Sequence, residues 1–437
     1  MITHPIPSSV RTYRALALPA VVAVSALLLT GCGGAAPAAA PGSARGASSE
    51  PAPPEGAKEA QARTPRLVLT HDAGITVLDA KTLKPVGGAE LEGFNRLNPA
   101  GDGRHLLVST GDAFRVFDAG VWTEAHGDHG HHYAGEPRLL DRAFAASKAG
   151  HVVRHAGRTV LFNDGTGKVE SFDPAGLADA VKTGLPATEV YTTPDAHHGV
   201  AVGLPGGKLL VTLGNDKGRS GIAVLDAAPE GGSSQDRKEI VRNEDCPGVH
   251  GEAVAAHEAV VVGCENGMLI YKDGKITKVA SPDAYGRMGN QAGSEKSPVI
   301  LGDYKVDKAA TLERPKRISL VNTETGTLQL VDLGASYSFR SLGRGPAGEA
   351  LVLGTDGALR VIDPLSGAVT STIPVVAAWE ESETWQDPRP TLFVQGTTAF
   401  VTEPAQRTIH AVDLKTGKVT KSAQLDVVPN ELSGVEG

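Results

Sequence analysis

An eight-fold internal repeat constrains the fold of this chain more than any other feature of its sequence. From Arg66 onward, a short run rich in β-branched residues recurs and ends in Asp or Asn, and several copies continue into a turn that contains Gly. Asp or Asn starts such turns by bonding the downstream backbone, and Gly supplies a positive φ. The eight marker residues are Asp79, Asp118, Asp173, Asp226, Asp273, Asn322, Asp363 and Asp413.

The spacing of these markers predicts the fold class. They recur about every 40–55 residues, and one or two further strand-like runs precede each of them. About four strands per unit at this period is typical of a β-propeller. We therefore predict an all-β, eight-bladed β-propeller domain over residues 65–437, with a seven-bladed ring as the alternative. We expect the strand Arg66–Thr70 to close the ring by completing the last blade.

The first 31 residues resemble an export signal. Arg11 and Arg14 precede an apolar run, Ala15–Leu28, that is too short for a comfortable transmembrane helix. The sequence Leu-Thr-Gly-Cys then ends at Cys32, as at the cleavage site of a lipoprotein. We predict that residues 1–31 are a lipoprotein signal peptide and that Cys32 becomes lipidated, which places the protein on the outer face of the cytoplasmic membrane. The alternatives are a single-pass anchor, or an ordinary signal peptide and a soluble periplasmic or secreted protein.

Residues 32–64 differ in composition from the rest of the chain. They consist mainly of Ala, Pro, Gly and Ser and contain almost no large apolar side chain. Such a segment cannot bury a core, so we predict a disordered tether between Cys32 and the propeller.

Two cysteines remain once Cys32 is set aside. Cys246 and Cys264 would lie outside the cytosol, where paired cysteines are oxidised, and we predict a disulfide between them. Free thiols and thiolate ligands to a metal are the alternatives.

A short segment, residues 126–132, holds four of the chain's 14 histidines and an aspartate. Imidazole and carboxylate groups are ligands that borderline divalent metals prefer, zinc first. We expect a loop, because so polar a run does not suit a core, and its candidate metal ligands are His126, Asp128, His129, His131 and His132. A polar surface turn that is His-rich by chance is the alternative.

Three further histidines fall at similar places in consecutive repeats. His151, His198 and His250 each lie where the innermost strand of a blade should begin, beside the central channel. Propeller symmetry would bring them together, so we predict a zinc site there, with a fourth ligand supplied by the His-rich loop folding over the channel mouth. Three isolated, hydrogen-bonded channel-wall histidines are the alternative.

Together these motifs resemble the AztD-type zinc metallochaperones. The resemblance runs from about Arg66 to the end of the chain, and it rests on the export signal, the His-rich loop and the motifs around His151, His198 and Cys246 to His250. It implies an eight-bladed propeller that binds zinc outside the cytoplasm and hands it to the solute-binding protein of a zinc ABC transporter. The lipobox and the long tether depart from this family pattern.

Other functions receive less support from the sequence. The net charge is −8 and no basic patch is present, which argues against nucleic acid as a partner. Neither a Gly-x-Ser-x-Gly nor a Cys-x-x-Cys motif occurs, and no catalytic or cofactor-binding residue is predicted. The alternatives to a chaperone are an exported propeller enzyme, either a metal-dependent hydrolase or a redox enzyme, and a metal-free protein-interaction scaffold.

Overall fold

The computed structural model describes residues 56–437. The predicted signal peptide, Cys32 and the predicted tether as far as residue 55 lie outside the described residues. In the part of the chain that is described, no helix has both the length and the apolar character needed to cross a bilayer.

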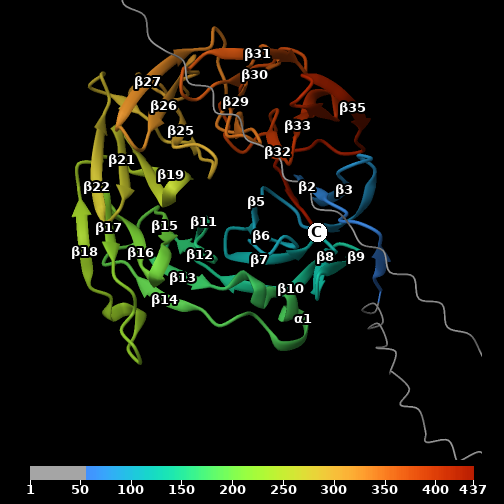
Figure 1. Cartoon of the computed structure of the whole chain (residues 1–437), viewed down its shortest axis with the longest axis horizontal. Coiled ribbons are helices and arrows are strands. Elements are labelled where there is room, and N and C mark those ends of the chain that lie inside the picture. Colours follow the sequence, from blue (N-terminus) through green and yellow to red (C-terminus); the bar gives the residue numbers. More distant parts are fainter. Residues whose placement is uncertain (1–55) are drawn as a thin grey trace, which may run out of the picture. The chain divides into compact units, whose positions relative to one another are not determined.

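Eight antiparallel sheets surround a common axis, with β5, β11, β19 and β32 on the axial side of their sheets (Figure 1). Seven of these sheets have four strands, and the sheet of the fifth blade gains a short parallel strand. The described residues are therefore an all-β, eight-bladed propeller, as the repeat predicts, and the seven-bladed alternative is wrong.

Within each blade the strands follow one another from the axis outward. Blades 1 to 4 are β36 (Leu432–Val435), β2 (Arg66–His71), β3 (Gly74–Asp79), β4 (Pro85–Glu90); β5 (Arg96–Pro99), β6 (His105–Ser109), β7 (Ala113–Asp118), β10 (Arg138–Ala145); β11 (Ala149–His155), β12 (Arg158–Asn163), β13 (Lys168–Phe172), β14 (Glu189–Thr192); and β15 (Ala201–Gly203), β16 (Leu209–Gly214), β17 (Arg219–Leu225), β18 (Glu239–Asn243).

The second half of the ring follows the same plan. Blades 5 to 8 are β19 (His250–Ala255), β20 (Ala259–Cys264), β21 (Asn266–Lys272), β22 (Lys275–Ala280), with β23 (Gly286–Arg287) beside β21; β24 (Gln291–Ala292), β25 (Val299–Asp303), β26 (Arg317–Asn322), β27 (Thr327–Asp332); β28 (Leu342–Arg344), β29 (Ala350–Leu353), β30 (Ala358–Ile362), β31 (Val369–Pro374); and β32 (Leu392–Gln395), β33 (Thr398–Glu403), β34 (Thr408–Asp413), β35 (Lys418–Gln424).

A few elements lie outside the blades. A small sheet, ordered β1-β9-β8, is inserted in blade 2, and short helical segments occupy some connections. These elements are β1 (Lys58–Ala60), β8 (Val121–His126), β9 (His129–Ala134), η1 (Pro174–Asp179), α1 (Ala180–Thr183), η2 (Pro205–Gly207), η3 (Ser234–Asp236), η4 (Ala256–Glu258) and η5 (Pro404–Gln406).

The hydrophobic core lies between adjacent blades. Every residue of β20 and of β29 is buried, on both faces of the sheet, whereas most of the outermost strand β35 is exposed. One cluster joins Val202 and Leu210 of blade 4 to Val260 and Leu269 of blade 5. Burying each such side chain contributes about 1.5–3 kcal/mol, so each blade is stabilised by its neighbours.

The recurring Asp at the end of the third strand has a local cause. Asp79 Oδ1 accepts a hydrogen bond from the backbone N–H of Thr82 at 2.7 Å, and Asp363 Oδ1 accepts one from Ser366 at 2.7 Å. The carboxylate thereby caps the turn into the outermost strand. The marker on which the sequence interpretation rests is a turn-forming residue.

Ring closure differs from the prediction in its direction. The strand at Arg66 does not complete the last blade: β2 is the second strand of blade 1, and the C-terminal strand β36 supplies the innermost strand of that blade. The two strands are antiparallel, with Arg66 opposite Val435 and Leu69 opposite Leu432. The last segment of the chain therefore joins the two ends of the ring.

The folded part begins earlier than the predicted boundary at residue 65. Strand β1 lies within the segment predicted to be a tether, yet it pairs with β9, with Lys58 opposite Ala134 and Ala60 opposite His132. Its composition did not predict a strand because the pairing depends on an exposed edge of a distant hairpin.

A disulfide joins Cys246 and Cys264, as predicted. Cys264 ends β20, and Cys246 lies in the loop that leads to His250 at the start of β19. The bridge therefore ties this loop to the blade that it enters.

Replacing both cysteines with Ala should lower the stability of the protein by about 3 kcal/mol, because the bridge closes a loop with a sequence separation of 18. Chemical denaturation of the zinc-free protein measures this change, and the wild type treated with a reductant should behave like the variant. An unchanged unfolding midpoint would contradict the expectation.

Candidate metal sites

Three histidines from consecutive blades meet at one end of the ring axis. His151 is in β11, His198 lies just before β15, and His250 is the first residue of β19. One ligand nitrogen of each lies within 4.8 Å of the others, and the ring centroids are 5.1–5.4 Å apart. We call these three residues the axial triad.

Each ring of the axial triad is held through its Nδ1 atom. His151 Nδ1 lies 3.3 Å from Glu252 Oε2, His198 Nδ1 lies 2.5 Å from Asp164 Oδ2, and His250 Nδ1 lies 2.6 Å from the carbonyl oxygen of Gly289. The contacts of His198 and His250 are hydrogen bonds to oxygen acceptors, so these two rings carry their proton on Nδ1, and the carboxylate beside His151 favours the same tautomer. The Nε2 lone pairs are then left to bind an ion, which is the usual arrangement of metal-bound histidines.

Irregular backbone brings these groups together. A β-bulge separates His250 from Glu252, where Gly251 has a φ of +71° and an added Cβ would lie 2.7 Å from the carbonyl oxygen of Gly289. A register shift also spans His151, and a Cβ on its neighbour Gly150 would lie 2.2 Å from Asp164 Oδ1. Bulges redirect side chains, and the two glycines leave room for the ring partners.

The sequence interpretation did not identify the residues that orient the rings. Glu252 follows His250 closely in sequence, but the bulge between them breaks the alternation from which its direction could be inferred. Asp164 lies in the β12–β13 turn, and Gly289 acts through its backbone oxygen. No sequence pattern signals either of these two contacts.

The electrostatic environment of the axial triad favours a neutral ligand set. Burial, and then the neighbouring His151, lower the pKa of His250 well below its ordinary value. Three imidazolium groups at this distance would repel one another, whereas neutral rings together can bind a cation.

The His-rich segment forms a second, separate cluster. It is a β-hairpin and not the predicted loop: β8 and β9 pair with His126 opposite His129, and Gly127, with a φ of +62°, begins the two-residue turn. His131 lies on the same face as these two, and ligand nitrogens of the three lie within 4.8 Å of one another. We call His126, His129 and His131 the hairpin triad.

Strand alternation separates the other two candidate ligands from the hairpin triad. His132 is on the opposite face of β9, where its Nδ1 lies 2.8 Å from Thr123 Oγ1. Asp128 is in the turn with an exposed side chain, and its Oδ1 lies 3.2 Å from His129 Nδ1. Neither residue belongs to the group of mutually close ligand atoms.

Strand β1 contributes a residue that the sequence interpretation assigned to the tether. Glu59 Oε1 lies 2.7 Å from Nδ1 of His131, whose side chain is only 9% exposed. A histidine in a polar run is thus buried under an added strand and bonded to a carboxylate. Its partner lies far away in sequence, so sequence patterns did not reveal the contact.

The two triads lie at opposite ends of the ring axis, so the hairpin does not complete the axial site as predicted. The axial triad gathers where the innermost strands begin. The hairpin begins after Asp118, at the end of blade 2 where the innermost strand β5 ends. Asp118 pairs there with His105 and with Arg138, at which the chain re-enters the blade. Thr123 of the hairpin also contacts Gly437, which follows the end of β36.

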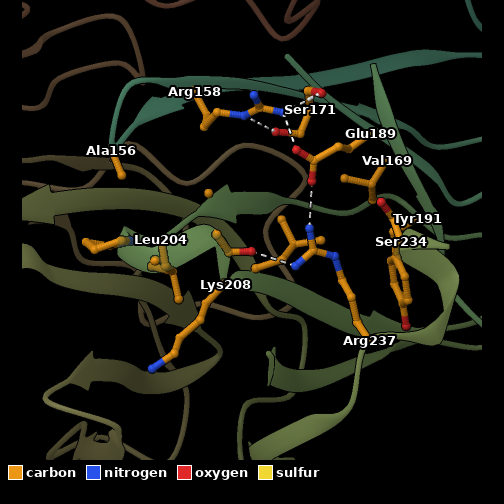
Figure 2. A pocket seen from close by; sticks show the side chains of 15 residues that line it. Ala156, Arg158, Val169, Ser171, Glu189, Tyr191, Leu204, Lys208, Ser234 and Arg237 are labelled. Carbon is orange, nitrogen blue, oxygen red and sulfur yellow. Dashed lines mark hydrogen bonds and ion pairs between the residues drawn. The ribbon is translucent and has the colours of Figure 1, made fainter. Parts of the chain in front are cut away.

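A cavity of 260 Å³ between blades 3 and 4 lies away from both triads (Figure 2). Its wall holds Arg158 and Arg237, and each donates a hydrogen bond of 2.9 Å to Glu189. Lys208 points away from this network. This network ties the two blades together.

Fold and sites together define a class: an eight-bladed β-propeller with two all-histidine clusters suited to a borderline divalent cation such as Zn²⁺. No family model matches the chain. The chain is 25% identical over 389 residues to the zinc chaperone AztD of Citrobacter koseri, an alignment that covers 85% of this chain and 86% of that protein. The resemblance inferred from the motifs is thereby confirmed.

Solved structures agree on the fold. The crystal structure of Citrobacter koseri AztD gives a TM-score of 0.71 at 24% identity, covering 86% of this chain and 99% of that one. The apo form of AztD gives 0.69 at 23% identity, covering 86% and 98%. NirN, a dihydro-heme d1 dehydrogenase, gives 0.53 at 11% identity, covering 85% and 75%, and shares the fold alone.

The lowered pKa of His250 predicts how stability depends on pH. The unfolded chain takes up a proton below about pH 6.5 that the folded chain does not, so the contribution of neutral His250 is present above that pH and is lost below it. The thermal midpoint of the zinc-free protein should therefore fall from about pH 7 to about pH 5.5, and less so for His250→Gln. Parallel curves for the two proteins would show that His250 does not cause the fall.

Proposed function

We propose that this protein is a zinc chaperone that acts outside the cytoplasm, holds Zn²⁺ in the axial triad and delivers it to the solute-binding protein of a zinc ABC transporter. The observation that supports this most directly is the axial triad itself. All three of its Nδ1 atoms lie within 3.3 Å of a protein oxygen, so three Nε2 atoms are left for one ion. Similarity to the zinc chaperone AztD supports the same conclusion.

A three-histidine site suits transfer as well as binding. Zinc in proteins prefers four ligands, and three protein nitrogens leave one position to water or to another donor. A ligand of the acceptor can take that position before any imidazole leaves. The ion then passes between the proteins without being fully released, which lowers the barrier relative to dissociation into water.

The hairpin triad supplies a second and more accessible site. His126 and His129 are exposed at the tip of a two-stranded hairpin, whereas in the axial triad only His198 is exposed and His151 and His250 are partly buried. An acceptor or free zinc can therefore reach the hairpin without entering the ring. We infer that the hairpin triad exchanges zinc quickly and that the axial triad holds it tightly.

Several features support an extracytoplasmic location and an anchored protein. The Cys246–Cys264 disulfide suits an oxidising compartment. The lipobox that ends at Cys32 supports a lipid anchor on the outer face of the cytoplasmic membrane, where a transporter-associated acceptor also works. The Ala/Pro/Gly-rich segment after Cys32 would then supply the reach between membrane and propeller.

An exported metal-dependent enzyme is the second candidate, favoured by the open fourth position of a three-ligand site. Hydrolysis would also need a general base beside the ion. The carboxylates in contact with the axial triad, Asp164 and Glu252, are engaged by His198 and His151. Their bonding to the ligand rings favours a role in orienting those rings over a role as a base, and supports a carrier.

Replacing His198 and His250 together with Ala should abolish the tight zinc site. Each lost ligand should weaken binding by at least about tenfold, because tetrahedral zinc depends on all of its protein donors. Metal analysis of the untagged protein and a chelator competition titration measure stoichiometry and affinity. His257→Asn is the control, since this exposed histidine pairs with Glu324 outside both triads.

Tight zinc that survives the double substitution would remove the axial triad from the proposal. A wild-type protein that carries no zinc at all would favour the interaction scaffold instead.

The two triads should contribute separately to delivery. Replacing His126 and His129 with Ser should slow transfer to the acceptor far more than it weakens the tight site, because the exposed ligands provide the exchange route. A stopped-flow transfer assay beside the competition titration measures both quantities. His132→Ser is the matched control, since this residue lies on the other face of the same strand.

Equal losses of transfer rate and tight affinity would show that the hairpin is part of the tight site. Unchanged transfer would leave the hairpin triad with no role in delivery.

A further inference from the structure

A second type of ligand site lies at the end of the ring axis opposite the axial triad. A cavity of 220 Å³ is formed there by the ends of the innermost strands of blades 1, 2, 3 and 8. Its lining includes Arg154 of β11, Gln395 of β32 and Glu436, which follows β36. Pro99, Phe393 and Val394 add apolar surface.

The cation in this cavity has no partner. Within residues 56–437, Arg154 makes neither a hydrogen bond nor an ion pair, although other arginines near the axis, such as Arg340 and Arg389, are bonded to carboxylates or carbonyls. The side chain of Arg154 is exposed at the mouth of the cavity, and the protein around it lowers its pKa by desolvation. A guanidinium stays charged in proteins and presents a planar set of donors that matches a carboxylate.

Acceptor groups without partners line the same cavity. The exposed carboxylate of Glu436 also forms no hydrogen bond or ion pair in the described part of the chain, so it lies more than 4.0 Å from the Arg154 guanidinium. Gln395 donates through Nε2 to the carbonyl oxygen of Val435 at 2.8 Å, while its Oε1 is buried without a partner among those residues. A buried acceptor without a donor costs free energy, which a ligand donor at this wall would recover.

Arg154 and Glu436 carry opposite charges on the same cavity but do not bond to each other. A ligand with both a negative and a positive group could therefore contact both side chains. We propose that this cavity binds a small zwitterion, an α-amino acid with a short apolar side chain. Its carboxylate bonds to Arg154, its ammonium group lies toward Glu436 and Gln395 Oε1, and its side chain contacts Phe393 and Val394. The cavity of Figure 2 differs in this respect, because both of its arginines form ion pairs with the same carboxylate, Glu189.

The test uses three probes that share one apolar side chain and differ in their charged groups. Each is titrated into the full-length, zinc-free protein by calorimetry or by NMR. L-Leucine is the zwitterion, 4-methylpentanoate lacks the ammonium group, and 3-methylbutylamine lacks the carboxylate. Leucine should bind most tightly, 4-methylpentanoate more weakly and 3-methylbutylamine least. Binding of leucine no tighter than that of both analogues, or no binding of leucine, would overturn the proposal.

Two substitutions assign the charges. Arg154→Gln should weaken leucine binding by about tenfold, because a charge-assisted hydrogen bond is lost. Glu436→Gln should weaken leucine binding and leave 4-methylpentanoate unaffected. Both side chains lack partners in the described protein, so neither change should lower the thermal midpoint. The control is Lys208→Gln, at the cavity of Figure 2, which should leave leucine binding unchanged. Unchanged leucine binding in Arg154→Gln would overturn the proposal, whatever the state of the zinc sites.

Discussion

The pairing of β36 with β2 is the interaction on which the rest of this molecule depends. It joins the last strand of the chain to the first blade, so that every blade has a neighbour on both sides. The central strands of the blades are apolar on both faces and would be partly exposed in an open ring. Closure therefore buries the apolar faces that the first and last blades would otherwise expose. It also fixes the positions of the blades relative to one another.

Closure also determines what the loops at each end of the axis can do. The innermost strands begin at one end, where contacts run from blade to blade: Arg340 bonds to Asn430, Asn290 to the carbonyl of Phe339, and His250 to the carbonyl of Gly289. Histidines at equivalent places in blades 3, 4 and 5 meet within this network. A metal site formed in this way is preorganised, because its ligands stand on strands that the ring itself holds.

The two triads combine the same chemistry with different surroundings. In both, Nδ1 atoms lie beside carboxylates, with Glu252 and Asp164 at the axial triad and Glu59 and Asp128 at the hairpin triad. One triad is assembled from three blades and has one exposed ring, His198, whereas the other stands on a hairpin supported by the short strand β1 and has two exposed rings. A larger exposed share of ligands favours exchange of an ion, and a smaller one favours its retention.

The sequence by itself determined the architecture of this protein. The repeated Asp, with its turn chemistry, marks each blade locally, and the place of His151, His198 and His250 in the repeat was enough to predict that they meet, because propeller symmetry relates equivalent positions. The pairing of Cys246 with Cys264 also followed from compartment and count.

Only the tertiary structure decided the details of the sites. Bulges at Gly251 and around His151 change the direction of side chains without any sequence signature, so Glu252 and Asp164 went unnoticed. The His-rich segment was expected to cover the axial triad. It instead extends from the other side of the ring, because the chain leaves blade 2 at the opposite end of that blade. Glu59 reaches His131 through a strand pairing between distant segments. Composition cannot reveal such a pairing, because β1 is stabilised by hydrogen bonds to the exposed edge of β9 and not by its own residue types.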